Sequence, residues 1–146
     1  MSKKDEAMSL FKLGANCSQA VLGAFAKECN LSYDEAMKLA SGFGAGMGRM
    51  REVCGAVSAM VLVANLKYGS ADLSDKAAKD EHYKLIQKLA EEFKRENGSI
   101  VCRELLGLAK NENTSPISEA RTESYYKKRP CAELVGMAAE ILEKNL

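Results

Sequence analysis

Apolar residues recur at three- and four-residue spacing along most of the chain, which is the period of an α-helix that packs one face on a core. No stretch of useful length alternates with the period of two that is typical of a strand. The clearest helical pattern covers residues 75–97. Its apolar stripe consists of Ala78, Leu85, Ile86, Leu89, Ala90 and Phe93. The pattern therefore predicts an all-α protein.

Capping residues set the expected bounds of these helices. Two pairs have the spacing of a capping box, Asn16 with Gln19 and Ser32 with Glu35. Ser74 is a third predicted cap, and glycines mark several helix ends. The first six predicted helices cover residues 3–13, 17–29, 33–41, 52–68, 75–97 and 100–107. A brief seventh helix is expected to begin at Ser115-Pro116. The last predicted helix has Pro130 as its first residue and runs to 144.

A chain of 146 residues has the size of one ordinary domain and buries roughly 70% of the surface that its unfolded form exposes. We find no linker and no internal repeat. The sequence therefore predicts one helical domain over residues 1–146, a bundle of about six to seven helices. A glycine-rich loop at residues 42–48 precedes its central helix.

Composition and charge narrow the class of protein. Lys and Arg number 21 against 20 Asp and Glu, so the net charge of +1 argues against a globally basic nucleic-acid binder. The longest apolar run, residues 56–64, is about half of the ~20 residues that a membrane span needs. The start of the chain lacks the pattern of a secretory signal. We expect a soluble cytoplasmic protein with no membrane span and no nucleic-acid partner.

Five cysteines are the most informative feature of the composition. Stable disulfides are rare in the cytoplasm, so clustered cysteines there suggest metal or redox chemistry. No C-x-x-C occurs, which excludes thioredoxin-type, zinc-ribbon and linear ferredoxin patterns. The single histidine excludes a His-rich metal site. We interpret His82 as a residue at the edge of the core, with metal ligation as the less favoured reading.

Four of the cysteines fall in the first turn of a predicted helix, and each lies on the apolar stripe of its helix. These four are Cys17, Cys54, Cys102 and Cys131. Free N–H groups at a helix start favour a thiolate, so we expect lowered thiol pKa values there. Four inward sulfurs at the ends of packed helices predict one shared site. Cys29, at a predicted helix end, stands apart, and buried thiols that serve only as small hydrophobic side chains remain an alternative.

The glycine-rich loop lacks the spacing of a nucleotide-binding motif, and no strand precedes it. We interpret it as a loop whose backbone approaches a cofactor, with free N–H groups for its sulfurs, although a plain linker remains open. Gly55, early in a helix, indicates close packing against another backbone or against the site. The predicted cofactor contacts are Gly44, Gly46, Gly48, Arg49 and Arg51. The charges of Arg103 and Arg129 are also expected to offset those of several thiolates.

These elements together resemble the C_GCAxxG_C_C family, bacterial proteins of about this length that are described as redox-active. The resembling segments are NCSQA at 16–20, GFGAGMGRMREVCGAVSA at 42–59, CREL at 102–105 and RPCA at 129–132. The second segment is the specific one, with Ala59 where the family's Cys-Gly-Ala-x-x-Gly motif has glycine. The resemblance implies redox activity. A related domain is associated with split-Soret cytochromes, which suggests an iron–sulfur centre.

Four hypotheses follow for the four cysteines. The first is an iron–sulfur centre that serves electron transfer or redox sensing, for a partner enzyme or a transporter-linked system. The second is a metal-free thiol–disulfide oxidoreductase. The third is a structural zinc site of four cysteines in an interaction module. The fourth is a helical domain with buried thiols and no centre. A site that is assembled between two subunits of a homo-oligomer also remains an alternative.

Overall fold

The computed structural model describes residues 1–110, 112–128 and 130–146, and these residues form helices and loops without a β-strand. The all-α prediction is confirmed. The helices are α1 (Lys3–Lys12), α2 (Cys17–Ala24), α3 (Tyr33–Ala40), the 3₁₀-helix η1 (Ser41–Phe43), α4 (Gly44–Met47), α5 (Gly55–Tyr68), α6 (Lys76–Asn97), α7 (Cys102–Leu105), α8 (Glu123–Lys128) and α9 (Cys131–Asn145).

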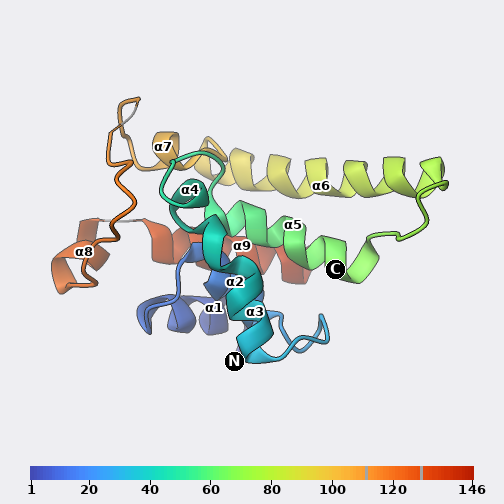
Figure 1. Ribbon diagram of the computed structural model, residues 1–146, viewed down its shortest axis with the longest axis horizontal. Helices are drawn as coiled ribbons and strands as arrows, with labels where there is room; N and C mark the ends of the chain where they lie inside the picture. Colours follow the sequence, from blue (N-terminus) through green and yellow to red (C-terminus); the bar gives the residue numbers. More distant parts are fainter. Residues whose placement is uncertain (111, 129) are drawn as a thin grey trace.

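The core forms where α1, α2, α5 and α9 pack together, with α6 against α5 and α9. The α5 helix is apolar around most of its circumference, as a helix surrounded by others must be. The stripe of α6 buries Leu89 and Phe93 against this core. Figure 1 shows α4, α7 and α8 gathered at one end of the molecule, whereas the turn that joins α5 to α6 lies at the opposite end.

Both predicted capping boxes form. The Asn16 side chain accepts from the Gln19 backbone N–H at 2.9 Å, and the Gln19 side chain accepts from the Asn16 N–H at 3.0 Å. Ser32 and Glu35 make the same reciprocal pair at the start of α3. These local signals fix where α2 and α3 begin, and therefore where the first predicted site cysteine lies.

Several predicted helix bounds are wrong. The second helix ends at Ala24 rather than 29, because the following residues tighten into turns and Asn30 is left-handed with φ 58°. The central helix begins at Gly55 rather than 52, because Val53 pairs with Val101 in an isolated antiparallel bridge.

The cap of α6 is also one residue from its predicted place. Asp75 accepts from the Ala78 N–H at 2.9 Å, whereas the Ser74 hydroxyl donates to Asp72 at 2.7 Å. Ser74 is occupied by this local turn, so the adjacent carboxylate caps the helix instead.

The brief helix expected at Ser115-Pro116 does not form. Carbonyl groups of this segment accept hydrogen bonds from Arg49, and the next helix is α8, which begins at Glu123. Pro130 occupies the N-cap of α9 rather than its first helical position.

Within the described residues, no helix combines the length and the apolar character that crossing a membrane requires.

Candidate functional site

One cavity of about 240 Å³ lies where several helices begin, and four cysteines line it: Cys17, Cys54, Cys102 and Cys131. All four side chains are buried. The predicted convergence of these residues from four separate parts of the chain is therefore observed. Cys29 is also buried but does not line this cavity. Apolar side chains, including Phe11 and Leu134, complete much of the wall.

Each of the four cysteines occupies the start of its helix, as predicted. Cys17, Cys102 and Cys131 are the first residues of α2, α7 and α9. Cys54 is the N-cap residue of α5. The packing of α2 against α5 and α9 brings three of these helix starts together.

A short antiparallel pairing places Cys54 beside Cys102. The Cys54 N–H donates to the Ile100 carbonyl at 2.8 Å, and the Cys102 N–H donates to the Glu52 carbonyl at 2.6 Å. This pairing is the isolated bridge between Val53 and Val101. No local sequence pattern encodes it, because each half consists of only a few extended residues between helices.

Gly55 packs against the site as its sequence position indicated. A Cβ atom added there would lie 2.9 Å from the Phe43 carbonyl oxygen and 3.2 Å from the Cβ of Cys17. The absence of a side chain thus lets the starts of α2 and α5 approach closely, which brings Cys17 and Cys54 to the same cavity.

The glycine-rich loop is a compact left-handed turn rather than a plain linker. Positive φ angles occur at Ala45, Gly46, Met47, Gly48, Arg49 and Arg51. For residues other than glycine this conformation costs about 1–2 kcal/mol each. A Cβ atom added to Gly46 would lie 2.6 Å from the Arg51 Cα and 2.7 Å from the Cys102 Cβ, so the backbone approaches the site closely.

The expectation of free loop amides for cofactor sulfurs is wrong for part of this turn. The N–H of Arg51 donates to the Ala45 carbonyl at 3.3 Å, and that of Glu52 to the Gly46 carbonyl at 2.9 Å. The Gly48 N–H donates to the Gly42 carbonyl at 2.9 Å. These amides stabilise the turn itself, because the left-handed backbone aims them at its own carbonyls.

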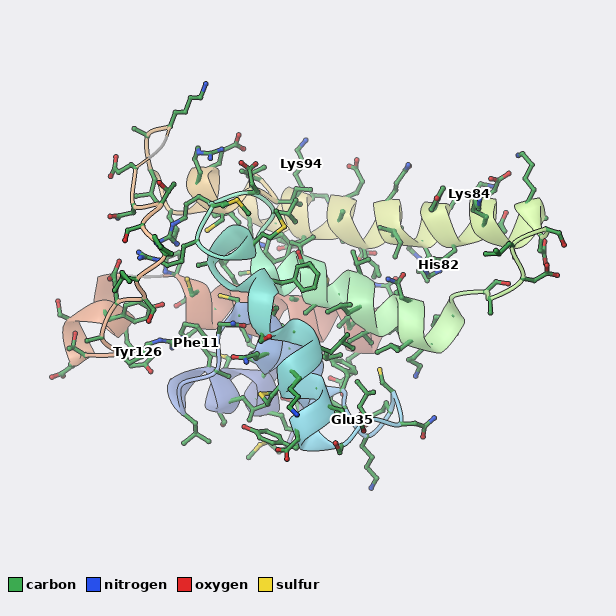
Figure 2. All side chains as sticks on the ribbon, viewed as in Figure 1. Phe11, Glu35, His82, Lys84, Lys94 and Tyr126 are labelled. Carbon is green, nitrogen blue, oxygen red and sulfur yellow. The ribbon has the colours of Figure 1, made fainter. Side chains whose placement is uncertain are left out.

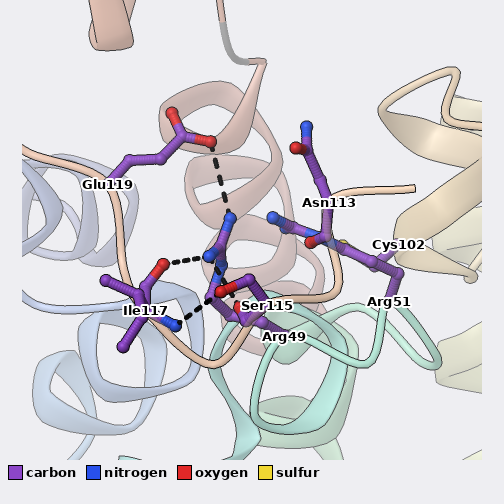
Figure 3. A network of polar contacts seen from close by, with 7 residues as sticks. All are labelled: Arg49, Arg51, Cys102, Asn113, Ser115, Ile117 and Glu119. Carbon is purple, nitrogen blue, oxygen red and sulfur yellow. Dashed lines mark hydrogen bonds and ion pairs between the residues drawn. The ribbon is translucent and has the colours of Figure 1, made fainter. Parts of the chain in front are cut away.

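All five predicted cofactor contacts line the cavity: Gly44, Gly46, Gly48, Arg49 and Arg51. The two arginines have different partners. Arg51 reaches Cys102, with 3.8 Å between Nη1 and Sγ, and its Nε donates to the Asn113 carbonyl at 3.0 Å. Figure 3 draws Arg51, Asn113 and Cys102 together on one side of the network.

Arg49 instead holds the segment 115–119 over the cavity. Its Nη1 donates to the Ser115 carbonyl at 2.7 Å and also to the Ile117 carbonyl, and its Nη2 pairs with Glu119 at 3.6 Å (Figure 3). Pro116, Ser118 and Glu119 line the cavity as a result. Sequence reasoning missed this segment because its position depends on an arginine more than 60 residues away.

Arg121 is a further cavity residue that sequence reasoning missed. Its guanidinium donates to the carbonyls of Phe11 and Ala15 at 3.1 and 3.0 Å. It also lies over the rings of Phe11 and Tyr125, 4.5 and 4.9 Å from their centroids. These contacts tie the segment that leads into α8 to the end of α1.

Two other polar residues, Arg103 and His82, lie apart from the cavity, and a third is not among the residues that the structure describes. Arg103 pairs with Glu52 at 3.6 Å and does not line the cavity. His82 is half-buried and contacts the Asn65 side-chain oxygen at 2.7 Å. Figure 2 shows it well away from Phe11, which lines the cavity. Arg129 lies outside the described residues.

The pKa values of Cys17 and Cys54 run opposite to the prediction. A hydrogen bond to Cys131, together with burial and the neighbouring thiols, raises the pKa of Cys17 well above its usual range. Burial raises the pKa of Cys54 to about 12, although the N–H groups of Ala56 and Val57 act to lower it. The helix-start effect is thus present at Cys54, but desolvation of the charged thiolate outweighs it.

The four cysteines line one cavity of about 240 Å³. In the ranges 1–110, 112–128 and 130–146, no group of three or more His, Cys, Asp and Glu side chains is arranged to hold a metal ion. Two thiols, those of Cys17 and Cys131, are in hydrogen-bond contact. The site therefore combines one pair of thiols in contact with two further thiols that line the same cavity.

The family model described as "Putative redox-active protein (C_GCAxxG_C_C)" matches residues 15–145, nearly the whole chain. The comparisons with curated proteins and with solved structures gave no match. The matched region contains all four cavity cysteines and the glycine-rich loop. Ala59, which stands at a motif glycine, is fully buried in α5 without disturbing the helix. The chain belongs to this family, C_GCAxxG_C_C, whose description is that of a "putative redox-active protein".

Proposed function

We propose that the protein holds an iron–sulfur cluster on Cys17, Cys54, Cys102 and Cys131 and uses it in electron transfer or redox sensing. The observation that supports this proposal is the convergence of four buried thiols, from four helix starts, on one cavity of about 240 Å³. Four cysteine thiolates are the usual ligand set of such clusters. The family's redox character agrees with this use.

The size of the cavity, about 240 Å³, favours a cluster over a single zinc ion. A tetrahedral zinc ion holds each sulfur at about 2.3 Å, which places the sulfurs only about 3.8 Å from one another. The described residues contain no group arranged in that way. A cluster carries several irons and sulfides of its own, so its protein ligands stand farther apart around a larger space. The soft thiolate set also suits iron–sulfur chemistry.

The chain's own residues would bind and shield the group. When bound, the cluster supplies a one-electron couple. The raised pKa values of Cys17 and Cys54 mean that these thiols lose protons only as the metal binds, so loading releases protons. The apolar wall and the segment 115–119 restrict water at the sulfurs. Arg49 and Arg51 place positive charge beside a cluster that carries net negative charge.

A second candidate is a dithiol that cycles with a disulfide, and the contact between Cys17 and Cys131 favours it. In this reaction the two thiols would form one S–S bond and release two protons. Their two electrons would reduce an acceptor disulfide to two thiols. The raised pKa of Cys17 makes its thiol a poor nucleophile at neutral pH, because the thiolate is the attacking species. We therefore rank this candidate second.

Anaerobic purification from cells supplied with both iron and zinc tests the proposal. The expected result is a brown protein with visible charge-transfer absorption and matching amounts of iron and acid-labile sulfide. A colourless protein with one zinc per chain would select the structural zinc site. A colourless, metal-free protein whose thiols titrate as a reversible two-electron couple would select the dithiol.

A further inference from the structure

Arg51 is a buried cation with an unusual set of partners. Its exposed fraction is 3%. Its Nε donates to the backbone carbonyl of Asn113, and its Nη1 lies 3.8 Å from the Sγ of Cys102. Within the described part of the chain, no carboxylate pairs with it. A buried charge without a partner of opposite sign is strongly unfavourable, so this arrangement calls for an anion at the cavity.

The other arginines of the site already have such partners. Arg49 pairs with Glu119, and Arg103 pairs with Glu52. Arg121 stacks on aromatic rings and donates to carbonyls at the end of α1. Among these four arginines, Arg51 therefore stands out as the one that is both buried and directed at a cysteine sulfur.

The backbone conformation of Arg51 is also energetically unfavourable. Its φ angle is 61°, in the left-handed region that favours glycine. The conformation is held by the hydrogen bond from its N–H to the Ala45 carbonyl. Strained backbone of this kind persists where the surroundings fix it, and it clusters at functional sites. The strain here directs the guanidinium inward, between the segment at Asn113 and the sulfur of Cys102.

We propose that Arg51 is the counterion of the cluster and raises its reduction potential through the N–H···S contact at Cys102. This inference rests on the proposed function. Reduction adds one electron to the cluster without making or breaking a bond, so the negative charge next to Arg51 increases. The guanidinium and its N–H group stabilise that added charge more than they stabilise the oxidised state. Removal of the positive charge therefore lowers the potential.

The test compares the wild-type protein with Arg51→Gln, Arg51→Lys and the control Arg103→Gln, all loaded with iron anaerobically. Gln and Lys, like Arg, are unbranched at Cβ, so the free-energy cost of the left-handed backbone at position 51 changes little. A spectroelectrochemical titration measures the potential. At the wild-type midpoint, we expect Arg51→Gln to lower the ratio of reduced to oxidised cluster about tenfold, a shift of ~59 mV for one electron. Arg51→Lys should shift less, and Arg103→Gln should match the wild type.

The outcomes separate this inference from the proposed function. A wild-type protein that binds no iron overturns both. Wild-type and Arg51→Gln clusters with equal potentials overturn the role of Arg51 and leave the cluster in place. If Arg51→Gln keeps its helical circular dichroism but binds no iron, the Arg51→Lys variant decides whether Arg51 acts as a counterion or only shapes the site. Loading of the lysine variant near the wild-type potential supports the counterion, whereas failure of both variants to load shows that Arg51 only shapes the site.

Discussion

The turn that carries Cys29 and the loop that leads to Cys54 both contain left-handed backbone and a buried cysteine, yet they are built differently. Hydrogen bonds between near neighbours close the first, such as that from the Leu31 N–H to the Ala26 carbonyl at 2.8 Å. The second has local hydrogen bonds too, but distant segments also hold it, since Cys54 itself donates to the Ile100 carbonyl at 2.8 Å. Burial is shared by both cysteines. Contacts between remote parts of the chain distinguish the site.

The two thiols differ in their surroundings as well. Burial raises the pKa of Cys29, and nearby Lys67 acts to lower it. No other thiol contributes to that shift, whereas Cys102 and Cys131 both contribute at Cys54. A buried cysteine is thus a candidate ligand here only where further thiols share its cavity.

Cys54→Ser should have the largest effect on the proposed cluster, and Cys29→Ser is its matched control. Loss of one of four ligands is expected to reduce bound iron to about a tenth of the wild-type amount or less, in line with losses from removing groups that support a metal site. Cys29→Ser should keep the wild-type iron content, measured per folded chain. Equal iron in both variants would remove Cys54 from the ligand set.

Gly46→Ala should produce the largest loss of stability of the metal-free protein. The added methyl would overlap the backbone of Arg51 and the Cβ of Cys102, and its residue would be left-handed at φ 73°. Overpacking and backbone strain together are expected to lower the free energy of unfolding by about 2–4 kcal/mol.

Gly48→Ala is the control within the same loop. It has a similar φ of 57° but open space at the added methyl, so strain alone predicts a loss of about 1–2 kcal/mol. Urea denaturation measures both variants. Equal losses at the two positions would contradict the close packing of Gly46 on the site.

Alkaline pH should destabilise the reduced, metal-free protein more when Cys54 is present. The pKa of Cys54 is about 12 in the folded protein and 9.0 without its surroundings. Because the folded value is the higher one, its stabilisation is complete below pH 9.0 and is lost as the pH rises toward 12. The expected loss is about 1.4 kcal/mol for each pH unit in that window.

The measurement is the difference in unfolding free energy between the wild type and Cys54→Ala at several pH values. This difference cancels the titration of lysines and tyrosines in the same window. A difference that stays constant from pH 8 to pH 11 would show that the Cys54 thiol is not desolvated as the structure indicates.

Asn30→Ala, in the turn that carries Cys29, should have the smallest effect. Asn30 has φ 58°, a conformation that asparagine tolerates better than alanine. The expected loss in unfolding free energy is about 1 kcal/mol, with no change in iron content. A loss of iron would connect this turn to the site and would weaken the contrast between the two cysteines.

The helical scaffold and the inward placement of the four cysteines at helix starts were predictable because local patterns encode them. Capping boxes at Asn16 and Ser32 fix two helix starts, and the inward position of each cysteine follows from the apolar stripe of its helix. Gly55 was predictable for a similar reason, since glycine early in a helix weakens it unless another group packs there.

The remaining features of the site depend on long-range contacts. The bridge between Val53 and Val101 joins two segments too short for a strand pattern. Ser115-Pro116 has the local signal of a helix start, but hydrogen bonds from Arg49 hold the segment in a bent, non-helical course instead. The direction of the pKa shift at Cys54 was predicted wrongly because burial, which no local pattern measures, outweighs the effect of the helix start there.

X-ray absorption at the iron edge, on anaerobically prepared protein, tests the central claim most directly, because it reports the atoms around the metal. Four cysteines on an iron–sulfur cluster predict sulfur as the only first neighbour of iron and a second iron nearby. Nitrogen or oxygen neighbours, or isolated irons without an iron–iron signal, would contradict the assignment of Cys17, Cys54, Cys102 and Cys131 as the ligands of one cluster.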